Sequence, residues 1–381
     1  MRNGEPRRVG LIVNPLAGVG GRLGYKGSDG AYGIKAVMMG AELVSPSRAS
    51  RFLRALSRLL KRQGIKVELV LPPGLMGEAS VREVLRESEV MEARIEKCVS
   101  PKMWPTTAHD TIRCAKRMAS SSEIIVFVGG DGTARNILYS IDQEVPSLGV
   151  PSGVKVYSSV FAVSPEKAAE VLADYLAGRA VLEEREVVDV DEDEFRRGRL
   201  VLRVYGKMIV PVSGGLVAAS KSPDTKGDVE GIARYFAESI YRECTLYILG
   251  PGTTVTAIAR AIGVGDKTLL GVDAVHNGEI VARDADERRL LSLLNSYERV
   301  AIVVSPIGGQ GFIFGRGNQQ ISPEVLRRAG RDSILVVSSP EKLEELKMLR
   351  VDTGDPDVDD MLRGYMRVLI GYGRWRMVKV E

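Results

Sequence analysis

The first part of the chain contains short apolar segments. Between two of them lies a longer stretch in which apolar side chains recur every three or four residues. Residues 9–13 and 124–128 are apolar runs, and residues 65–71 are a further apolar stretch that contains Lys66 and Glu68. Residues 47–63 carry the longer repeat. Apolar runs of this length are typical of buried strands, and the longer repeat is typical of a helix. Strands that alternate with helices predict an N-terminal parallel, doubly wound α/β sheet.

Two local signals place the starts of further helices in this part of the chain. Thr107 and Asp110 have the spacing of a capping box, which predicts a helix that opens at Thr107. A second helix is expected from about Ala134, with Thr133 as its cap.

The pattern changes after about residue 180. Residues 181–190 and 200–212 have the character of strands with no long helix between them, and strand–helix alternation returns from about residue 245. Asn277-Gly278 separates two apolar stretches, which predicts a hairpin. A chain of 381 residues exceeds one ordinary core. We therefore predict an N-terminal α/β nucleotide-phosphate-binding domain (1–150) and a second mixed, β-rich α/β domain (151–381), whose C-terminal tail is a candidate for packing back on the first.

Composition and charge narrow the classes of protein. With 44% apolar residues, 27% charged residues and a net charge of +4, the chain is globular and is not built to coat nucleic acid. Three distant cysteines without a CxxC pair argue against a disulfide framework or a cysteine zinc site. No apolar run is long enough to cross a membrane, so we expect a cytoplasmic protein. Scarce Asn and Gln beside abundant Arg and Glu suggest a thermophilic origin.

The strongest chemical signal is the run Gly129-Gly130-Asp131-Gly132-Thr133, which follows the strand at 124–128. Glycines there let backbone N–H groups approach an oxyanion, and the N-terminus of the following helix adds positive partial charge. Asp131 is then placed to accept a proton from an attacking hydroxyl or to hold Mg²⁺. The alternative is a tight turn in which Asp131 only satisfies backbone donors.

A second glycine-rich loop leaves the carboxyl end of the first strand, the edge at which open α/β sheets bind ligands. It has neither the Walker A pattern nor the dinucleotide GxGxxG pattern, because no helix starts soon enough. The candidate phosphate-binding residues of this loop are Asn14, Pro15, Gly18, Gly20, Gly21 and Lys26. A surface loop whose cations are merely solvated is the alternative.

These loops, together with the run Gly149-Val150-Pro151-Ser152-Gly153-Val154-Lys155, resemble the superfamily of NAD kinases, diacylglycerol kinases and 6-phosphofructokinases. Residues 129–133 and the strand pair near 183–190 are similar to NAD kinases, and residues 26–30 and 306–312 resemble the AcoX-type branch of that family. The resemblance runs from residue 14 to about residue 355. It implies that residues 129–133 hold the ATP phosphates, that Asp131 is the catalytic acid/base, that NAD is the acceptor and that Mg²⁺ bridges the phosphates.

The acceptor site is less clearly marked. NAD kinases carry an Asn-Glu or Asn-Asp pair after the catalytic turn, and this chain has no clear copy of it. The loop at 306–317 is rich in glycine and is followed by amides, which suit recognition of a base or ribose edge. The candidate acceptor-binding residues are Asn136, Gly153, Lys155, Gly308, Gly309, Gln310, Gly311 and Asn318. A crowded turn packed into the core is the alternative, and the acidic stretch at 352–360 is expected to cap helices.

The leading hypothesis is an ATP-dependent kinase that uses ATP and Mg²⁺ to phosphorylate a ribose hydroxyl of NAD(H) or a related nucleotide. We expect it to be a homo-oligomer without nucleic-acid or membrane partners. A lipid or small-polyol kinase of the same superfamily is an alternative, although the sequence has no basic amphipathic helix that would support a lipid substrate. A non-catalytic nucleotide-binding regulator is a third possibility, because the usual acceptor pair is missing.

Overall fold

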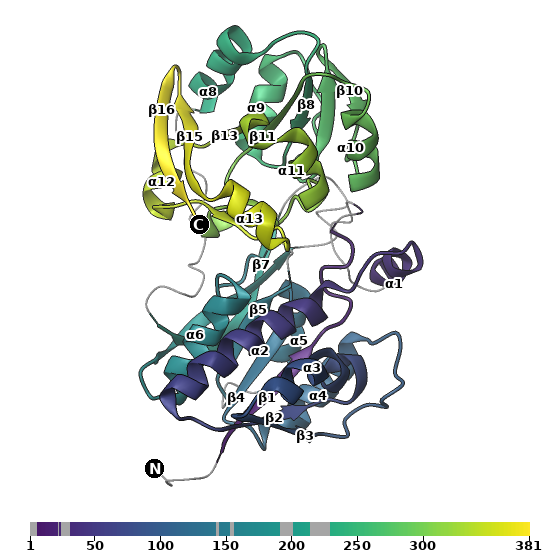
Figure 1. The fold of residues 1–381 in the computed structure, drawn as a ribbon, viewed down its shortest axis with the longest axis vertical. Coiled ribbons are helices and arrows are strands. Elements are labelled where there is room, and N and C mark those ends of the chain that lie inside the picture. Colours follow the sequence, from purple (N-terminus) through teal and green to yellow (C-terminus); the bar gives the residue numbers. More distant parts are fainter. Residues whose placement is uncertain are drawn as a thin grey trace. The chain divides into compact units, whose positions relative to one another are not determined.

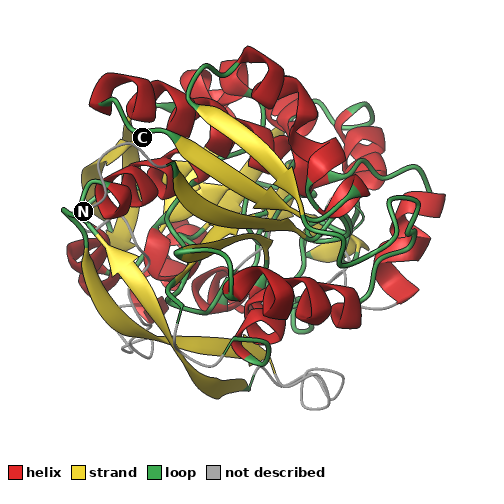
Figure 2. Cartoon of the chain, turned by 90° about the horizontal axis from the view of Figure 1, so that it is seen from below, coloured by secondary structure: helices red, strands yellow, loops and turns green. Residues whose placement is uncertain are grey.

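The computed structural model describes residues 6–21, 23, 31–141, 145–152, 156–190, 201–213 and 229–381. Helices and strands joined by loops make up this part of the chain (Figure 2). Contacts divide the chain into two compact units. The first comprises Met1–Val19, Ser28–Ser152 and Val156–Ser220, and the second comprises Gly20–Gly27, Gly153–Lys155 and Lys221–Glu381. This division differs from the expected boundary near residue 150, because residues 156–220 group with the first unit.

The first unit contains a five-stranded parallel sheet in the order β3-β2-β1-β4-β5 (Figure 1). Its strands are β1 (Arg7–Val13), β2 (Val67–Leu71), β3 (Met91–Ile95), β4 (Ile124–Gly129) and β5 (Ser147–Pro151). Every residue of the interior strand β4 is buried, as expected for a parallel strand covered on both faces. The predicted α/β fold class is confirmed.

The helices of this unit are α1 (Ala31–Met38), α2 (Val44–Gln63), α3 (Glu78–Glu87), α4 (Ala108–Ala119), α5 (Asp131–Leu138) and α6 (Pro165–Leu176), with a 3₁₀ turn η1 (Gly74–Met76). Helix α2 buries Phe52, Leu53, Leu56 and Leu60 along one face and ends at Gly64, whose φ of 66° only glycine adopts readily. It packs beside α3 and α6, whereas α4 packs beside α5 (Figure 1). The predicted capping box of Thr107 and Asp110 opens α4 and is confirmed.

The strand pair predicted near residues 181–212 is confirmed as an antiparallel ribbon of β6 (Val181–Val190) and β7 (Leu202–Val212). The ribbon packs against α5, β5 and α6. These contacts explain why the chain beyond residue 150 still belongs to the first unit, and they bring β6 close to the turn that follows β4.

The second unit contains a mixed seven-stranded sheet in the order β10-β9-β8-β11-β13-β15-β16. Its strands are β8 (Leu246–Leu249), β9 (Asp273–His276), β10 (Glu279–Ala282), β11 (Val300–Val304), β13 (Ile334–Val337), β15 (Gly364–Gly371) and β16 (Arg374–Val380). Strands β8, β11, β13 and β15 are parallel, and the outer strands are antiparallel to their neighbours. The predicted hairpin between β9 and β10 is confirmed, with positive φ angles of 50° at Asn277 and 78° at Gly278.

A small parallel pair, β12 (Phe312–Phe314) and β14 (Arg350–Val351), stands apart from the large sheet. The helices of this unit are α8 (Val229–Tyr235), α9 (Thr253–Ala261), α10 (Glu287–Leu294), α11 (Pro323–Ala329), α12 (Pro340–Leu346) and α13 (Pro356–Leu362). Its shorter turns are the π-helix η2 (Phe236–Ile240) and the 3₁₀ turns η3 (Gly308–Gln310) and η4 (Arg331–Ser333). An apolar cluster that includes Ile248, Ile302 and Phe314 fills the core between these elements.

One expectation about the cysteines is wrong. Cys98 and Cys114, 16 residues apart, form a disulfide that ties the segment before α4 to that helix, and both residues are buried. Cys244 is free and exposed. Across the part of the chain that the structure describes, no helix combines the length and apolar character needed to span a membrane.

Candidate active site

The two glycine-rich loops of the first unit start at neighbouring strand ends. Strands β1 and β4 are adjacent and parallel, with Val13 paired to Val128, and the strand order reverses between them. In open α/β sheets the carboxyl edge at such a reversal is the usual ligand site. Both loops therefore start at the same edge of one sheet.

Side-chain contacts join the loops at this edge. The Nδ2 of Asn14 donates to the Oγ1 of Thr133 at 2.9 Å, and the Oδ1 of Asn14 accepts from the Leu16 amide at 3.1 Å. The backbone N–H of Asn14 donates to the Val128 carbonyl at 3.0 Å. Asn14 thus fixes the start of the first loop against the first turn of α5.

One glycine in each loop, Gly18 and Gly129, is closely packed. Gly18 has a φ of 83°, and a Cβ there would lie 2.3 Å from the carbonyl oxygen of Ser152. A Cβ on Gly129 would lie 2.4 Å from the Oγ1 of Thr133. Both positions exclude any larger residue because neighbouring atoms already fill the space. For Gly129 this differs from the expected reason, which was access for a phosphate.

Helix α5 begins three residues earlier than predicted. Asp131 is its first residue, Gly130 is the N-cap with extended backbone, and Gly132 lies in the first turn. Thr133 is therefore inside the helix, and its predicted capping role is wrong. The earlier start places Asp131 itself at the positive end of the helix dipole.

The remaining residues of the first loop have separate positions. Pro15 and Gly20 are buried. Gly20 and Gly21 both group with the second unit, and a Cβ on Gly21 would lie 2.9 Å from the Cδ of Gln319. Lys26 lies outside the described residues, as do Gly153 and Lys155.

Asp131 is the central group of the site, with only 7% of its surface exposed. Its Oδ1 accepts from the Ser158 amide at 2.9 Å and from the Ser158 hydroxyl at 2.6 Å, and its Oδ2 accepts from the Tyr157 amide at 2.7 Å. Burial raises the pKa of Asp131 from 3.8 to about 7, although the Ser158 and Tyr157 donors lower it. The negative charge of Asp189 adds to the rise.

Asp189, on β6, is a second carboxylate near Asp131. Its Oδ2 lies 3.1 Å from the Nη1 of Arg135 on α5. The guanidinium of Arg135 also lies over the ring of Tyr205, 5.1 Å from its centre. Burial raises the pKa of the Tyr157 phenol, and the charges of Asp131 and Asp189 add to that effect. These groups form a compact polar cluster around the turn.

The sequence reading missed Ser158, Asp189 and Arg135. Asn136, the one predicted acceptor residue on α5, is half-buried. Its neighbour Arg135 makes the ion pair instead, and that pair depends on how the ribbon packs against α5. No local pattern in the sequence encodes this packing.

The amide-rich loop of the second unit surrounds a buried arginine. Arg316 is 2% exposed, and its guanidinium lies 4.0 Å from the centre of the Phe312 ring. Its Nη1 donates to the Oε1 of Gln310 at 2.7 Å, and its Nη2 lies 3.4 Å from the Oδ2 of Asp352. The Nη1 of Arg350 donates to the Gln310 carbonyl at 2.6 Å. Gln310 is therefore part of a buried polar network.

The other candidates in this loop have a structural role as well. Asn318 is fully buried, and its Nδ2 donates to the Ile313 carbonyl at 2.8 Å. Gly308 and Gly309 lie in η3, and a Cβ on Gly308 would meet open space, whereas one on Gly311 would lie 2.7 Å from the Met348 carbonyl oxygen. Within the described part of the chain, Gln310 Nε2 and Asn318 Oδ1 are buried without a hydrogen-bond partner.

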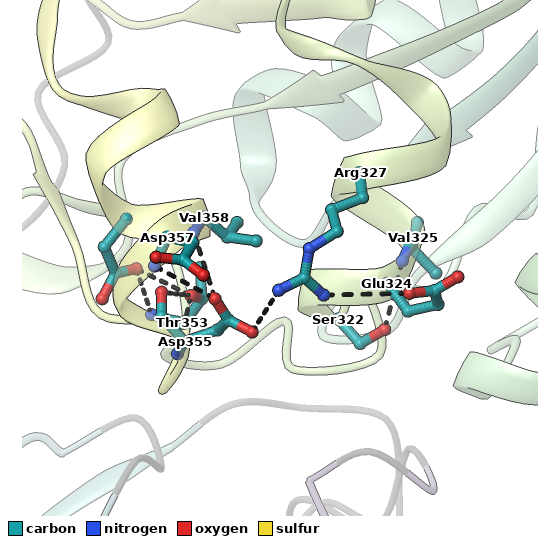
Figure 3. Close-up of polar contacts among 9 residues, drawn as sticks. Ser322, Glu324, Val325, Arg327, Thr353, Asp355, Asp357 and Val358 are labelled. Carbon is teal, nitrogen blue, oxygen red and sulfur yellow. Dashed lines mark hydrogen bonds and ion pairs between the residues drawn. The ribbon is translucent and has the colours of Figure 1, made fainter.

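The acidic stretch at 352–360 caps helix α13, as expected (Figure 3). The Oδ1 of Asp355 accepts from the amides of Asp357 and Val358, both at 3.1 Å. Arg327, on α11, forms an ion pair with Asp355 and lies 3.8 Å from the carboxylate of Glu324. These carboxylates are engaged in capping and ion pairing.

The Mg²⁺-binding role expected of Asp131 stays a prediction. Three hydrogen bonds already engage its two oxygens, and Asp189 faces Arg135. Among the residues that the structure describes, no group of three His, Cys, Asp or Glu side chains could hold a metal ion. In phosphoryl-transfer sites Mg²⁺ usually binds through one or two carboxylates together with waters and substrate phosphates, so it does not require such a group.

A parallel α/β unit whose polar cluster lies where the strand order reverses defines a nucleotide-binding type of α/β protein. Family comparison agrees with this class. Residues 9–180 match the ATP-NAD kinase N-terminal domain, and residues 243–380 match the ATP-NAD kinase C-terminal domain. The chain belongs to the ATP-NAD kinase family. Comparisons with curated proteins and with solved structures gave no match, and the AcoX-type branch stays a prediction.

Proposed function

We propose that this chain is an ATP-dependent phosphotransferase that phosphorylates a ribose hydroxyl of NAD(H) or a related nucleotide. The observation that carries the proposal is the buried carboxyl of Asp131 at the start of α5, whose pKa burial raises to about 7. A general base works best when its pKa lies near the working pH. Membership of the ATP-NAD kinase family supports the same activity.

In this proposal Asp131 accepts the proton of the acceptor hydroxyl. The hydroxyl oxygen then forms a bond to the γ-phosphorus of ATP, while the bond from that phosphorus to the β–γ bridging oxygen breaks. ADP leaves with the electron pair of the broken bond, and the proton stays on Asp131 until solvent removes it. The N-terminus of α5 offers positive partial charge to the phosphates. Mg²⁺ would arrive with ATP, held by its phosphates.

The phosphate side of the site is proposed on Asn14, Pro15, Gly18, Gly20, Gly21, Lys26 and residues 129–133. Asn14 supports this assignment because it joins the two loops through Thr133. Close packing requires glycine at positions 18 and 129, so we propose that Gly18 and Gly129 shape the loops and do not contact the phosphates directly.

The acceptor side is proposed on the amide-rich loop at 308–318, with Asn136, Gly153 and Lys155 as further candidates. Gln310 retains an unpaired buried donor and Asn318 an unpaired buried acceptor. Leaving such groups unpaired costs about 1–3 kcal/mol each. A nucleotide edge with one acceptor and one donor would satisfy both groups, which supports a polar, planar ligand over a lipid.

The test is ADP formation from ATP and Mg²⁺ with a panel of acceptors: NAD, NADH, free nucleosides, small polyols and diacylglycerol. We expect ADP with NAD or NADH, together with a dinucleotide that has gained one phosphate. ADP formed only with a polyol or a lipid would replace the acceptor assignment. Binding of ATP without ADP formation from any acceptor would favour a non-catalytic regulator.

We also propose a cytoplasmic homo-oligomer from a heat-adapted organism. Disulfides are rare in the cytosol of organisms that grow at moderate temperature but common in that of hyperthermophiles. The buried Cys98–Cys114 disulfide and the composition are compatible with both proposals together. Size determination by light scattering in solution tests the oligomer.

A further inference from the structure

Ser158 connects the carboxylate of Asp131 to the strand β6. It is 1% exposed, and its hydroxyl oxygen lies 2.6 Å from the Oδ1 of Asp131. The same oxygen lies 2.8 Å from the Val188 carbonyl and accepts from the Val188 amide at 2.9 Å. One buried hydroxyl thus bridges the first turn of α5 and the ribbon.

A hydroxyl has a single proton and two acceptor lone pairs. The Val188 amide uses one lone pair of Ser158, so the Ser158 proton has two competing acceptors, Asp131 Oδ1 and the Val188 carbonyl oxygen. When Asp131 is ionised, its charge attracts this proton, and 2.6 Å is typical of such a charge-assisted bond. When Asp131 is protonated, it can donate to Ser158, whose own proton then turns to Val188.

We propose that Ser158 is a positioning residue that holds Asp131 by reversing the direction of their shared hydrogen bond as the carboxyl gains and loses its proton. Its role in turnover rests on the proposed kinase function, whereas the hydrogen-bond exchange itself does not. In both states Asp131 and Ser158 keep a hydrogen bond to each other, so neither form of the buried carboxyl loses its Ser158 partner. Asp131 therefore cycles between base and acid without moving.

The other groups that act on Asp131 come from the elements packed around it. Asp189 contributes a negative charge from β6, and Arg135, on α5, lies beside Asp189. The Tyr157 amide donates to the Oδ2 of Asp131 at 2.7 Å. Burial and the charges of Asp131 and Asp189 raise the pKa of the Tyr157 phenol. Ser158 is distinguished from these groups because it contacts Oδ1 through a hydroxyl that can reverse its hydrogen bond.

Ser159 provides a matched control. It is also 1% exposed, and its hydroxyl donates to the Glu186 carbonyl of the same ribbon at 3.2 Å. Ser159→Ala likewise removes a buried hydroxyl and its bond to β6. It leaves the donors of Asp131 in place, so a general loosening of the ribbon would affect both variants alike.

The decisive measurement is the titration of the Asp131 carboxyl by ¹³C NMR in full-length protein labelled at the aspartate carboxyl carbon. Loss of one signal in Asp131→Asn identifies it. Ser158→Ala removes a hydrogen bond from both forms of Asp131, but the charge-assisted bond to the ionised form is the stronger, so the titration midpoint should rise by about one pH unit. Ser158→Thr keeps the hydroxyl and should return the midpoint to that of the parent protein, as should Ser159→Ala. Ser158→Cys, a weak donor, replaces Ser158→Ala if that variant does not fold.

Equal midpoints in Ser158→Ala and the parent, or equal shifts in Ser158→Ala and Ser159→Ala, would overturn the proposal. Where the parent forms ADP, the acid limb of the pH–turnover profile should move upward by the same amount in Ser158→Ala, with ATP affinity unchanged. A parent that forms no ADP would count against the proposed function alone, because the NMR titration still decides the role of Ser158.

Discussion

The buried carboxyl of Asp131 should make the stability of the protein depend on pH in an unusual direction. Its pKa is raised from 3.8 to about 7, mainly by burial. Between these values the folded protein keeps a proton that the unfolded chain has released. The free energy of unfolding therefore falls as the pH rises from about 4 to about 7, and this contribution levels off above that range. A shift of about three units corresponds to about 4 kcal/mol.

Asp131→Asn removes this titration while retaining the size of the side chain. The assay is urea denaturation of the parent and the variant between pH 4.5 and about 8, followed by circular dichroism. The difference between their free energies of unfolding should change by about 3–4 kcal/mol across this range, in favour of the variant at higher pH. All other titrating groups are the same in the two proteins, so their contributions to the pH dependence cancel in the difference. Parallel pH profiles for the two proteins would refute the burial argument.

Three further predictions concern stability and binding. Gly18→Ala should cost more than 2 kcal/mol in chemical denaturation because its Cβ would meet a carbonyl oxygen at 2.3 Å, whereas Gly178→Ala, with a φ of 72° in open space, should cost only about 1 kcal/mol. Similar losses would contradict the packing role of Gly18. Reduction of the Cys98–Cys114 disulfide should lower the free energy of unfolding by about 3 kcal/mol, and an unchanged denaturation midpoint under reductant would contradict this. Asn318→Ala should lower the affinity for the acceptor nucleotide roughly 5- to 150-fold and leave the affinity for ATP unchanged, as measured in separate titrations. Equal losses of affinity for both ligands would show that the loop has only a structural role.

Much of the fold could be predicted because its signals are local. The apolar run at 124–128 identified β4, the repeat at 47–63 identified α2, and Asn277-Gly278 identified the β9–β10 hairpin. Each depends on a few consecutive side chains and their period. The membership of β6 and β7 in the first unit could not be predicted, because it depends on packing against α5, β5 and α6, which lie elsewhere in the sequence.

The site divides in the same way. Asn14 and Asp131 could be found because both follow strands whose carboxyl ends share one edge of a sheet. Ser158 contacts Asp131, and Asp189 contacts Arg135, only once the chain has folded, so their spacing in the sequence carries no signal. The Cys98–Cys114 disulfide was missed for a related reason, since a separation of 16 residues matches no motif.

The measurement that tests the central claim most directly is steady-state ADP formation with ATP, Mg²⁺ and NAD, in the parent and in Asp131→Asn. The variant keeps the shape of the side chain and loses the base, so turnover should fall by about 100-fold or more, the usual range for lost acid/base work. The affinity for ATP should change little. Turnover in the variant within about threefold of the parent would contradict the assignment of Asp131 as the general base.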